Sequence, residues 1–296
     1  MIHQILKETF GYDQFRPMQE TVIEHILDKK DALVIMPTGG GKSLCYQIPA
    51  LAQDGLTVVV SPLIALMEDQ VASLVQNGVQ AAALNSAMNA DEQRMIYHKI
   101  QTKELKLLYV SPERINNDRF YEFLRSIDLS FFAIDEAHCV SMWGNDFRSD
   151  YVELKKLKSE FPDIPVLALT ATADAATRED IVKQLAIPES KLFLGSFERH
   201  NIYLRSMPAK DRVKYITRFI FNQQQGSGII YCLSRKGTES MAAKLQAAGI
   251  NAGFYHAGMN RDDRSRVQRN FQNDQLQVIC ATIAFGMGID KPNIRF

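Results

Sequence analysis

The segment Met36–Ser43 reads MPTGGGKS and lies between a short apolar run and the helix-compatible run Leu44–Leu51. A buried strand, a glycine-rich turn and a helix in this order form a cradle for phosphate, because glycine allows positive φ and close approach of backbone N–H groups. The N-terminus of the helix adds positive potential. Lys42 would then neutralise the β- and γ-phosphates, and Ser43 would ligate Mg²⁺. The expected nucleotide-binding residues of this loop are Thr38, Gly39, Gly40, Gly41, Lys42 and Ser43.

The loop departs from the common form of this motif at one position. Met36 stands six positions before Lys42, where glycine is usual. A glycine-rich turn that binds no ligand is therefore the alternative interpretation.

The length of 296 residues favours two domains. A hydrophobic content of 46% with 23% charged residues is typical of a soluble globular protein. No apolar run is long enough to span a bilayer, and residues 1–10 carry Lys7 and Glu8 where a signal peptide would be apolar. We therefore expect an intracellular protein without membrane association, cytoplasmic in a bacterium or nuclear in a eukaryote, and a monomer.

The cysteines are far apart in the sequence and form no Cys-x-x-Cys pair. This spacing predicts buried, reduced thiols, with neither a disulfide framework nor a zinc site. The cysteines are Cys45, Cys139, Cys232 and Cys280.

The formal net charge of zero is unevenly distributed. Residues 1–207 contain 21 Lys+Arg and 28 Asp+Glu, whereas residues 208–296 contain 13 and 6. A neutral chain does not suit a protein that simply coats nucleic acid. The halves, at −7 and +7, could attract each other or share the binding of a polyanion, and ordinary solvated faces explain the counts equally well.

Short apolar runs alternate with helix-length amphipathic segments along the chain. Because the runs are continuously apolar, they predict strands buried on both faces, as in parallel sheets flanked by helices. Ligands of such sheets bind at the carboxyl ends of the strands. The pattern restarts near residues 205–208, which predicts two α/β domains, 1–205 and 206–296. The runs are 32–36, 57–60, 81–84, 107–110, 131–134, 166–169, 228–232, 252–255 and 277–280.

Several polar residues lie next to the predicted strands. Gln19 opens a helix, and its amide offers the donor and acceptor that match adenine, although a surface position is the alternative. Ser61 and Ser111 each follow a strand and precede a helix, where they suit phosphate contacts or helix capping. Thr170 and Thr172 follow a later strand, where they could link the nucleotide site to the second domain, or Thr172 could cap a helix.

The apolar run Phe131–Ile134 leads directly into Asp135 and Glu136. Asp135 could hold Mg²⁺ opposite Ser43, usually through water, and Glu136 is placed to polarise the water that attacks the γ-phosphate. Two adjacent carboxylates at the end of a buried strand repel each other unless a cation is present. Together with the phosphate loop, this pair predicts hydrolysis of a nucleoside triphosphate.

The segment Cys139–Arg148 contains the only tryptophan. Trp143 and Phe147 could stack on nucleobases while Arg148 binds a phosphate. Core packing is the alternative for the aromatic residues. The neighbouring glycine and polar residues favour a loop.

These motifs together resemble superfamily 2 helicases, and specifically the RecQ family of DNA helicases. The resemblance covers essentially the whole chain, and the aromatic-rich loop beside the Asp-Glu-Ala-His box is its most specific part. The matching segments are Phe10–Gln19, Met36–Ala50, Val58–Gln70, Asp135–His138, Cys139–Arg148, Leu169–Ala173, Gly228–Cys232 and Ala281–Pro292.

The resemblance implies two RecA-like domains with ATP and Mg²⁺ bound between them. It also implies 3′-to-5′ movement along DNA in recombination and repair, with single-stranded DNA and duplex junctions as partners. By this resemblance, adenine would be bound by Tyr12, Arg16 and Gln19. The phosphates, Mg²⁺ and the attacking water would be bound by Lys42, Ser43, Asp135 and Glu136. His138 would couple this site to the aromatic-rich loop, where single-stranded DNA would be sensed by Trp143, Phe147 and Arg148.

The chain departs from the family pattern in three respects. Asn145 stands where the family commonly has histidine, and Asp290 stands where asparagine is frequent. The sequence stops at Phe296, before the family's arginine-finger motif and its zinc-binding and winged-helix regions, so a C-terminally truncated second domain is expected. A missing arginine finger costs roughly a thousandfold in turnover. We therefore expect this chain to bind ATP, to bind DNA weakly, to hydrolyse ATP slowly and not to unwind duplexes.

Two other functions stay open at this stage. One is a superfamily 2 RNA helicase, in which the likeness of the aromatic loop is due to chance. The other is a nucleotide-gated nucleic-acid-binding module without catalysis, against which Glu136 argues.

Overall fold

The computed structural model describes residues 1–296 except 86–87, 142–148, 197, 199–200, 209, 224–225, 284 and 286–290. The chain forms two compact units, Met1–His200 and Asn201–Phe296. The sequence pattern places the boundary after residue 205, and the two units divide five residues earlier. Each unit has its own sheet and its own apolar cores.

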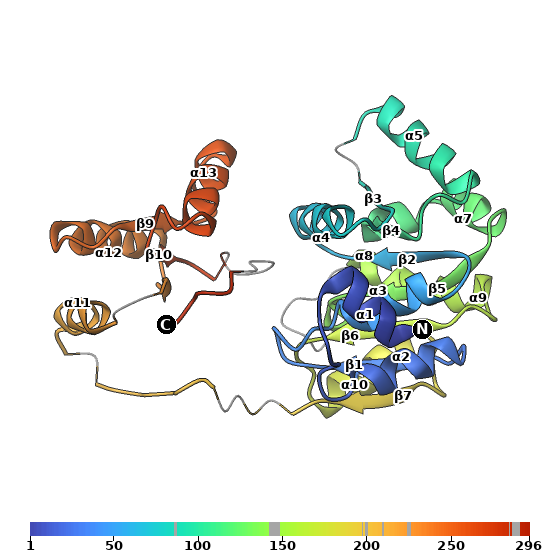
Figure 1. Ribbon diagram of the computed structural model, residues 1–296, viewed down its shortest axis with the longest axis horizontal. Helices are drawn as coiled ribbons and strands as arrows, with labels where there is room; N and C mark the ends of the chain where they lie inside the picture. The colour runs from blue at the N-terminus through green and yellow to red at the C-terminus, as the bar shows by residue number, and fades with distance from the viewer. Residues whose placement is uncertain are drawn as a thin grey trace. The chain divides into compact units, whose positions relative to one another are not determined.

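The first unit contains a seven-stranded sheet in the order β3-β4-β2-β5-β6-β1-β7, and every pair of neighbouring strands is parallel (Figure 1). Strand β6 therefore lies between β5 and β1, and the carboxyl ends of all three meet at one edge. The strands are β1 (Ala32–Ile35), β2 (Leu56–Val60), β3 (Ala81–Leu84), β4 (Leu107–Val110), β5 (Leu129–Ile134), β6 (Val166–Thr170) and β7 (Lys191–Leu194).

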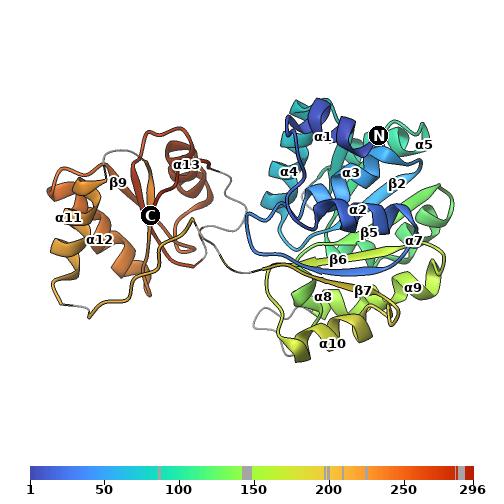
Figure 2. The ribbon, with the colours of Figure 1, turned by 60° about the horizontal axis from the view of Figure 1, so that its bottom comes forward.

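Side chains of these strands alternate between two apolar cores, one on each face of the sheet. In β1, Leu33 and Ile35 enter one core, and Ala32 and Val34 enter the other. Helices cover both cores, which explains why the sequence shows continuous apolar runs. Figure 2 shows α8, α9 and α10 on one side of the sheet and α1, α2 and α3 on the other.

In the first unit, α1 and α2 precede β1, and the other helices lie between successive strands. Helix α1 packs on α2 and α3 through Leu6, Ile23 and Ile48. The helices are α1 (Ile2–Phe10), α2 (Gln19–Leu27), α3 (Leu44–Ala52), α4 (Ile64–Gln76), α5 (Ala90–Gln101), α6 (Pro112–Ile115), α7 (Asp118–Arg125), η1 (Ala137–Val140), α8 (Ser149–Val152), η2 (Glu153–Lys155), α9 (Lys156–Glu160) and α10 (Ala175–Gln184).

Strand β7 does not correspond to any of the apolar runs expected from the sequence. It pairs only with β1, at the edge of the sheet, and of its residues only Phe193 is buried. An edge strand contacts the core with one side, so its sequence lacks the continuous apolar character of the central strands.

The second unit contains a three-stranded parallel sheet in the order β8-β10-β9. Ile220 of α11 and Leu245 of α12 pack on one face, and Phe271 of α13 packs on the other. The elements are α11 (Arg212–Asn222), β8 (Gly228–Tyr231), α12 (Arg235–Ala247), β9 (Ala252–Tyr255), α13 (Arg261–Gln272) and β10 (Val278–Ala281).

Residues 293–296 run along the other edge of β8. The Ser227 N–H donates to the Asn293 carbonyl (3.0 Å), the Arg295 N–H to the Ser227 carbonyl (2.8 Å) and the Ile229 N–H to the Phe296 carbonyl (2.9 Å). The predicted α/β class, with parallel sheets flanked by helices, is confirmed in both units. No helix in the described part of the chain has the length and apolarity needed to cross a membrane.

Candidate functional site

The topology of the first unit brings the predicted nucleotide-binding motifs to one place. The phosphate loop follows β1, the acidic pair follows β5, and both strands flank β6. Because the three strands are parallel, the loop, Asp135 and Thr170 all lie at the carboxyl edge where ligands of such sheets bind. The Met36 N–H extends the pairing of β1 by donating to the Thr170 carbonyl (3.1 Å).

The backbone of the phosphate loop adopts a conformation that favours glycine. Gly39 and Gly41 have φ of 75° and 83°, and the Gly40 N–H donates to the Pro37 carbonyl (2.9 Å). A Cβ at Gly40 would lie 2.8 Å from that carbonyl oxygen, and one at Gly41 would collide with the Gln19 amide. Helix α3 begins immediately after Ser43. The loop has no room for side chains at these two positions, and its glycine backbone followed by the N-terminus of α3 suits a phosphate.

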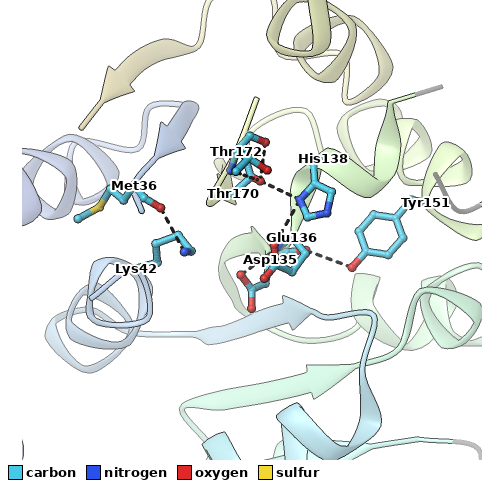
Figure 3. A network of polar contacts seen from close by, with 8 residues as sticks. All are labelled: Met36, Lys42, Asp135, Glu136, His138, Tyr151, Thr170 and Thr172. Carbon is cyan, nitrogen blue, oxygen red and sulfur yellow. Dashed lines mark hydrogen bonds and ion pairs between the residues drawn. The ribbon is translucent and has the colours of Figure 1, made fainter. Parts of the chain in front are cut away.

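Lys42 and Asp135 lie close enough to interact electrostatically. The Lys42 ammonium group donates to the Met36 carbonyl (3.2 Å), and its charge lowers the pKa of Asp135. Figure 3 shows the two side chains extending toward the same space from the loop and from the end of β5. The lysine is therefore held over the cradle, where it can meet a phosphate.

Gln19 is buried, with 1% of its surface exposed, and both ends of its amide bind this chain. Its Oε1 accepts from the Arg16 N–H (2.8 Å), and its Nε2 donates to the Gly41 carbonyl (3.0 Å). The Arg16 guanidinium group hydrogen-bonds the Gly39 carbonyl. Tyr12 is half exposed. The segment before β1 thus buttresses the phosphate loop, and adenine binding by these residues stays a prediction.

The acidic pair is shaped by an unusual backbone conformation. Asp135 continues β5, with its N–H donating to the Val60 carbonyl (2.9 Å). Glu136 has a left-handed φ of 49°, and its N–H donates to the Asp135 carboxylate (3.0 Å). A non-glycine residue in this region is uncommon, and here the conformation lets the Glu136 N–H face the carboxylate of the preceding residue.

Burial, followed by the negative charge of Glu136, raises the pKa of Asp135 to about 7, against the opposing effects of the Glu136 N–H and Lys42. A cation at this position would stabilise both carboxylates. In the described part of the chain, no three His, Cys, Asp or Glu side chains gather into a metal-binding group. The two adjacent carboxylates at the end of β5 suit Mg²⁺, which binds through one or two protein ligands and the phosphates of its nucleotide.

His138 connects the acidic pair to the end of β6. Its Nδ1 lies 2.8 Å from the Thr170 hydroxyl and 3.3 Å from the Glu136 carboxylate. The Thr170 hydroxyl also donates to the Thr172 carbonyl (3.2 Å) and accepts from the Thr172 N–H (3.3 Å). Figure 3 shows this group of contacts. The threonine hydroxyl is thus joined to the acidic box, a contact that the sequence analysis did not foresee.

Two helix-capping alternatives are wrong. The cap of α10 is Asp174, which accepts from the Thr177 N–H (2.8 Å), so Thr172 lies outside the helix. The cap of α4 is Leu63 rather than Ser61, and the Ser61 hydroxyl is buried without a hydrogen-bond partner in the described structure. Ser111 is the N-cap residue of α6, without a side-chain capping bond.

The predicted DNA-sensing residues Trp143, Phe147 and Arg148 lie outside the described residues, as do Asn145 and Asp290. The described residues on either side are anchored to the first unit. The anchoring contacts are those of the Ser141 hydroxyl with the Asp180 carboxylate (2.7 Å), the Tyr151 hydroxyl with the Asp135 carbonyl (3.1 Å) and the Asn116 amide with the Asp150 carbonyl (2.8 Å).

Sequence reasoning missed Tyr151 and a set of polar residues behind the phosphate loop. Tyr46, Gln47 and Tyr109 are all buried, and their polar groups are joined by hydrogen bonds. The only sequence signal was the presence of Tyr46 and Gln47 in an otherwise apolar helix.

Residues 16–181 match the family described as DEAD/DEAH box helicase, and residues 211–296 match the family described as helicase conserved C-terminal domain. The first match covers more than half of the chain. The chain belongs to the DEAD/DEAH box helicase family.

The resemblance to RecQ helicases is confirmed by similarity to curated proteins. The chain is 50% identical over 292 residues to the ATP-dependent DNA helicase RecQ of Haemophilus influenzae, covering 99% of this chain and 47% of that protein. It is 42% identical over 307 residues to the ATP-dependent DNA helicase Q1 of Rattus norvegicus, covering 100% of this chain and 49% of that protein. The chain spans about half the length of these relatives.

Solved structures share the fold at low sequence identity. The helicase MrfA bound to DNA and AMPPNP has a TM-score of 0.76 at 17% identity, covering 98% of this chain and 44% of that one. Dbp5 of Saccharomyces cerevisiae, bound to RNA and ADP BeF3, has a TM-score of 0.72 at 16% identity, covering 98% of this chain and 76% of that one. The predicted RecA-like fold is therefore confirmed.

Proposed function

We propose that this chain is the ATP-hydrolysing motor of a RecQ-like DNA helicase. The observation that carries the proposal is the convergence of the phosphate loop and the acidic pair on either side of β6, with the charge of Lys42 acting on Asp135. The 50% identity to a RecQ helicase supports DNA as the polymer on which the motor acts.

Each residue of the site has a role that its position suits. The backbone of Gly39–Gly41 and the Lys42 ammonium group bind the β- and γ-phosphates. Ser43 and Asp135 hold Mg²⁺, which when bound neutralises charge on the phosphates. Glu136 accepts a proton from the attacking water, and His138 orients Glu136 through its contact with that carboxylate. Tyr12, Arg16 and Gln19 bind the adenine.

We infer the wider activity from the resemblance to RecQ helicases. We propose an ATP-binding domain over residues 1–205 and a second RecA-like domain over residues 206–296. Trp143, Phe147 and Arg148 contact single-stranded DNA, and movement runs 3′ to 5′ toward duplex junctions in recombination and repair. The protein acts as a monomer where chromosomal DNA lies, in the bacterial cytoplasm or the eukaryotic nucleus. This chain alone is expected to bind ATP and to hydrolyse it slowly.

The test is the release of phosphate from ATP by this chain, alone and with single-stranded DNA or RNA of the same base sequence. We expect slow turnover that DNA stimulates more than RNA. Stimulation by RNA alone would replace the DNA helicase with an RNA helicase. Nucleotide binding without turnover, in this chain and in one extended toward the length of its relatives, would indicate a binding module.

A further inference from the structure

A network of hydrogen-bonded polar side chains extends through the apolar core from the first turn of α3, beside the phosphate loop, to α4. Its members are Tyr46 and Gln47 of α3, Tyr109 of β4 and Gln70 of α4. Tyr46 and Tyr109 are each 1% exposed and Gln47 is 5% exposed. A polar group buried in a core costs free energy unless its hydrogen bonds are made.

Hydrogen bonds connect all four side chains of this network. The Tyr46 and Tyr109 hydroxyls hydrogen-bond each other at 3.4 Å, and the two rings meet edge to face with centroids 6.3 Å apart. The Gln47 Nε2 donates both to the Tyr109 hydroxyl (3.4 Å) and to the Gln70 Oε1 (3.1 Å). A single amide nitrogen thus joins α3, β4 and α4.

The inner end of this network lies one helical turn from Ser43, one of the two expected ligands of Mg²⁺. Burial, followed by the charges of Tyr109 and Asp135, raises the pKa of Tyr46, while a hydrogen bond from the Ser43 side chain lowers it. Burial raises the pKa of Tyr109 to about 12, with a smaller contribution from the charge of Asp135. Tyr46 lies in the first turn of α3, and its N–H donates to the Ser43 carbonyl (3.2 Å).

The outer end lies in the helix that follows β2. Gln70 is partly buried, and α4 begins at Ile64 without a side-chain cap. Phenylalanine at positions 46 and 109 would fill nearly the same volume without any buried hydroxyl. The hydroxyls therefore orient neighbouring groups in addition to filling space, as outer ligands do around a metal.

We propose that Tyr46, Gln47 and Tyr109 are positioning residues for Ser43, because they fix the first turn of α3, and that Gln70 ties the Mg²⁺-dependent affinity for nucleotide to α4. This inference rests on the proposed function, because it requires a nucleotide–Mg²⁺ complex at the phosphate loop. It predicts that a substitution in α4, a helix outside the phosphate loop, weakens the contribution of the metal to nucleotide binding.

The experiment titrates the full chain with a fluorescent ATP analogue, once with Mg²⁺ and once with EDTA, and takes the ratio of the two dissociation constants. Tyr46→Phe and Tyr109→Phe should each reduce the Mg²⁺-dependent gain in affinity roughly tenfold, as outer-shell substitutions do at metal sites. Gln70→Leu should reduce it about threefold, and the double variant Y109F/Q70L should show less than the sum of the two effects. Affinity in EDTA should not change.

Two control variants separate positioning from general damage to the fold. Tyr121→Phe removes a buried hydroxyl that has no hydrogen-bond partner in the described structure, from the core on the opposite face of the sheet. Gln76→Leu changes an exposed glutamine in the same helix as Gln70. Both should keep the wild-type ratio.

The outcomes distinguish this inference from the proposed function. A wild-type ratio in Y46F, Y109F and Q70L overturns the inference and leaves the proposed function intact. An equal loss in the two controls, or an equal loss with and without Mg²⁺, reduces these residues to structural ones and also overturns it. Failure of the wild-type chain to bind nucleotide more tightly with Mg²⁺ overturns both. Gln70→Leu, at the partly buried end, keeps the test valid if a tyrosine variant does not fold.

Discussion

The carboxyl ends of the strands differ between the two units, although both sheets are parallel and covered by helices. In the first unit, Gln19, His138 and Thr170 hydrogen-bond with the segments that follow β1, β5 and β6. In the second unit, Leu233 and Ile283 lie two residues beyond β8 and β10 and are 106% and 87% exposed. Among the described residues, the first unit fixes polar groups at the ends of its strands by hydrogen bonds, whereas the second unit presents apolar side chains there.

One polar contact in the second unit qualifies this comparison. His256 follows β9 directly, is buried, and places its Nε2 3.0 Å from the Glu239 carboxylate. Its Nδ1 has no hydrogen-bond partner in the described structure. The second unit thus holds a histidine–carboxylate pair too, but without the hydroxyl that completes the corresponding group around His138.

The largest effect is expected from Glu136→Gln in the first unit. Loss of the proton acceptor should lower phosphate release about a thousandfold, within the range for general bases, while nucleotide binding is retained. The matched variant in the second unit is Glu239→Gln, which should leave turnover unchanged. Steady-state phosphate release and nucleotide titration measure both. A comparable loss in Glu239→Gln would break the assignment of the chemistry to the first unit.

The next effect compares two glycines with nearly equal backbone angles. Gly41 has φ of 83° and Gly249 has φ of 84°. Alanine at Gly249 meets no atom within 4 Å, so it should cost only about 1 kcal/mol of unfolding free energy from backbone strain. Alanine at Gly41 should cost at least that and, by displacing Gln19, weaken nucleotide binding by roughly tenfold or more.

Thermal unfolding and nucleotide titration distinguish these two glycine variants. Equal nucleotide affinity in G41A and G249A would mean that the loop tolerates the displacement of Gln19. In that case the cradle would not depend on the buttress provided by the segment before β1.

A smaller effect on turnover is expected from Thr170→Val. The change removes the hydroxyl that contacts His138 and Thr172, so phosphate release should fall roughly tenfold with little change in nucleotide affinity. Thr238→Val is the counterpart in the second unit, since the Thr238 hydroxyl donates only to the Arg235 carbonyl (2.6 Å) among the contacts in the described structure. It should alter thermal stability alone. Unchanged turnover in T170V would remove His138 from the proposed orientation of Glu136.

The smallest effect concerns acid stability of the second unit. Hydrogen bonds from Lys291 and Asn293 lower the pKa of Asp274 below its ordinary value of 3.8. Because the folded pKa is depressed, the contribution to stability is present above pH 3.8 and is lost as the pH falls through the folded value. Amide exchange of the full chain should show protection at residues 271–279 declining in that window. Asp274→Asn should abolish this part of the pH dependence, and an unchanged profile would contradict it.

The sequence predicted the parts of the site that are local. Lys42 and Ser43 follow glycines within one loop, and Asp135 and Glu136 follow one buried strand. The position of each pair is therefore determined by residues close to it in the sequence. The parallel sheets could also be predicted, because continuous apolar runs require helices on both faces. That these motifs lie close together could be predicted because the carboxyl ends of parallel strands meet at one edge of the sheet.

The parts that sequence could not predict depend on tertiary neighbours. Tyr46 and Tyr109 are 63 positions apart and meet only because α3 packs against β4. The bond from the Gln19 amide to the Gly41 carbonyl joins the segment before β1 to the phosphate loop, a contact that no local pattern indicates. Threonine often caps helices, but α10 begins after Asp174 rather than Thr172, and the Asp174 carboxylate accepts the Thr177 N–H.

The Thr170 hydroxyl has a single hydrogen and two acceptors within reach, the Thr172 carbonyl oxygen and the imidazole of His138. If the hydrogen points to the carbonyl, the histidine must supply its own from Nδ1; if it points to the imidazole, Nδ1 must be bare. The direction of the Thr170 O–H bond and the tautomer of His138 are therefore coupled: reversing this hydrogen bond requires the imidazole proton to be lost from Nδ1 and another to be gained at Nε2.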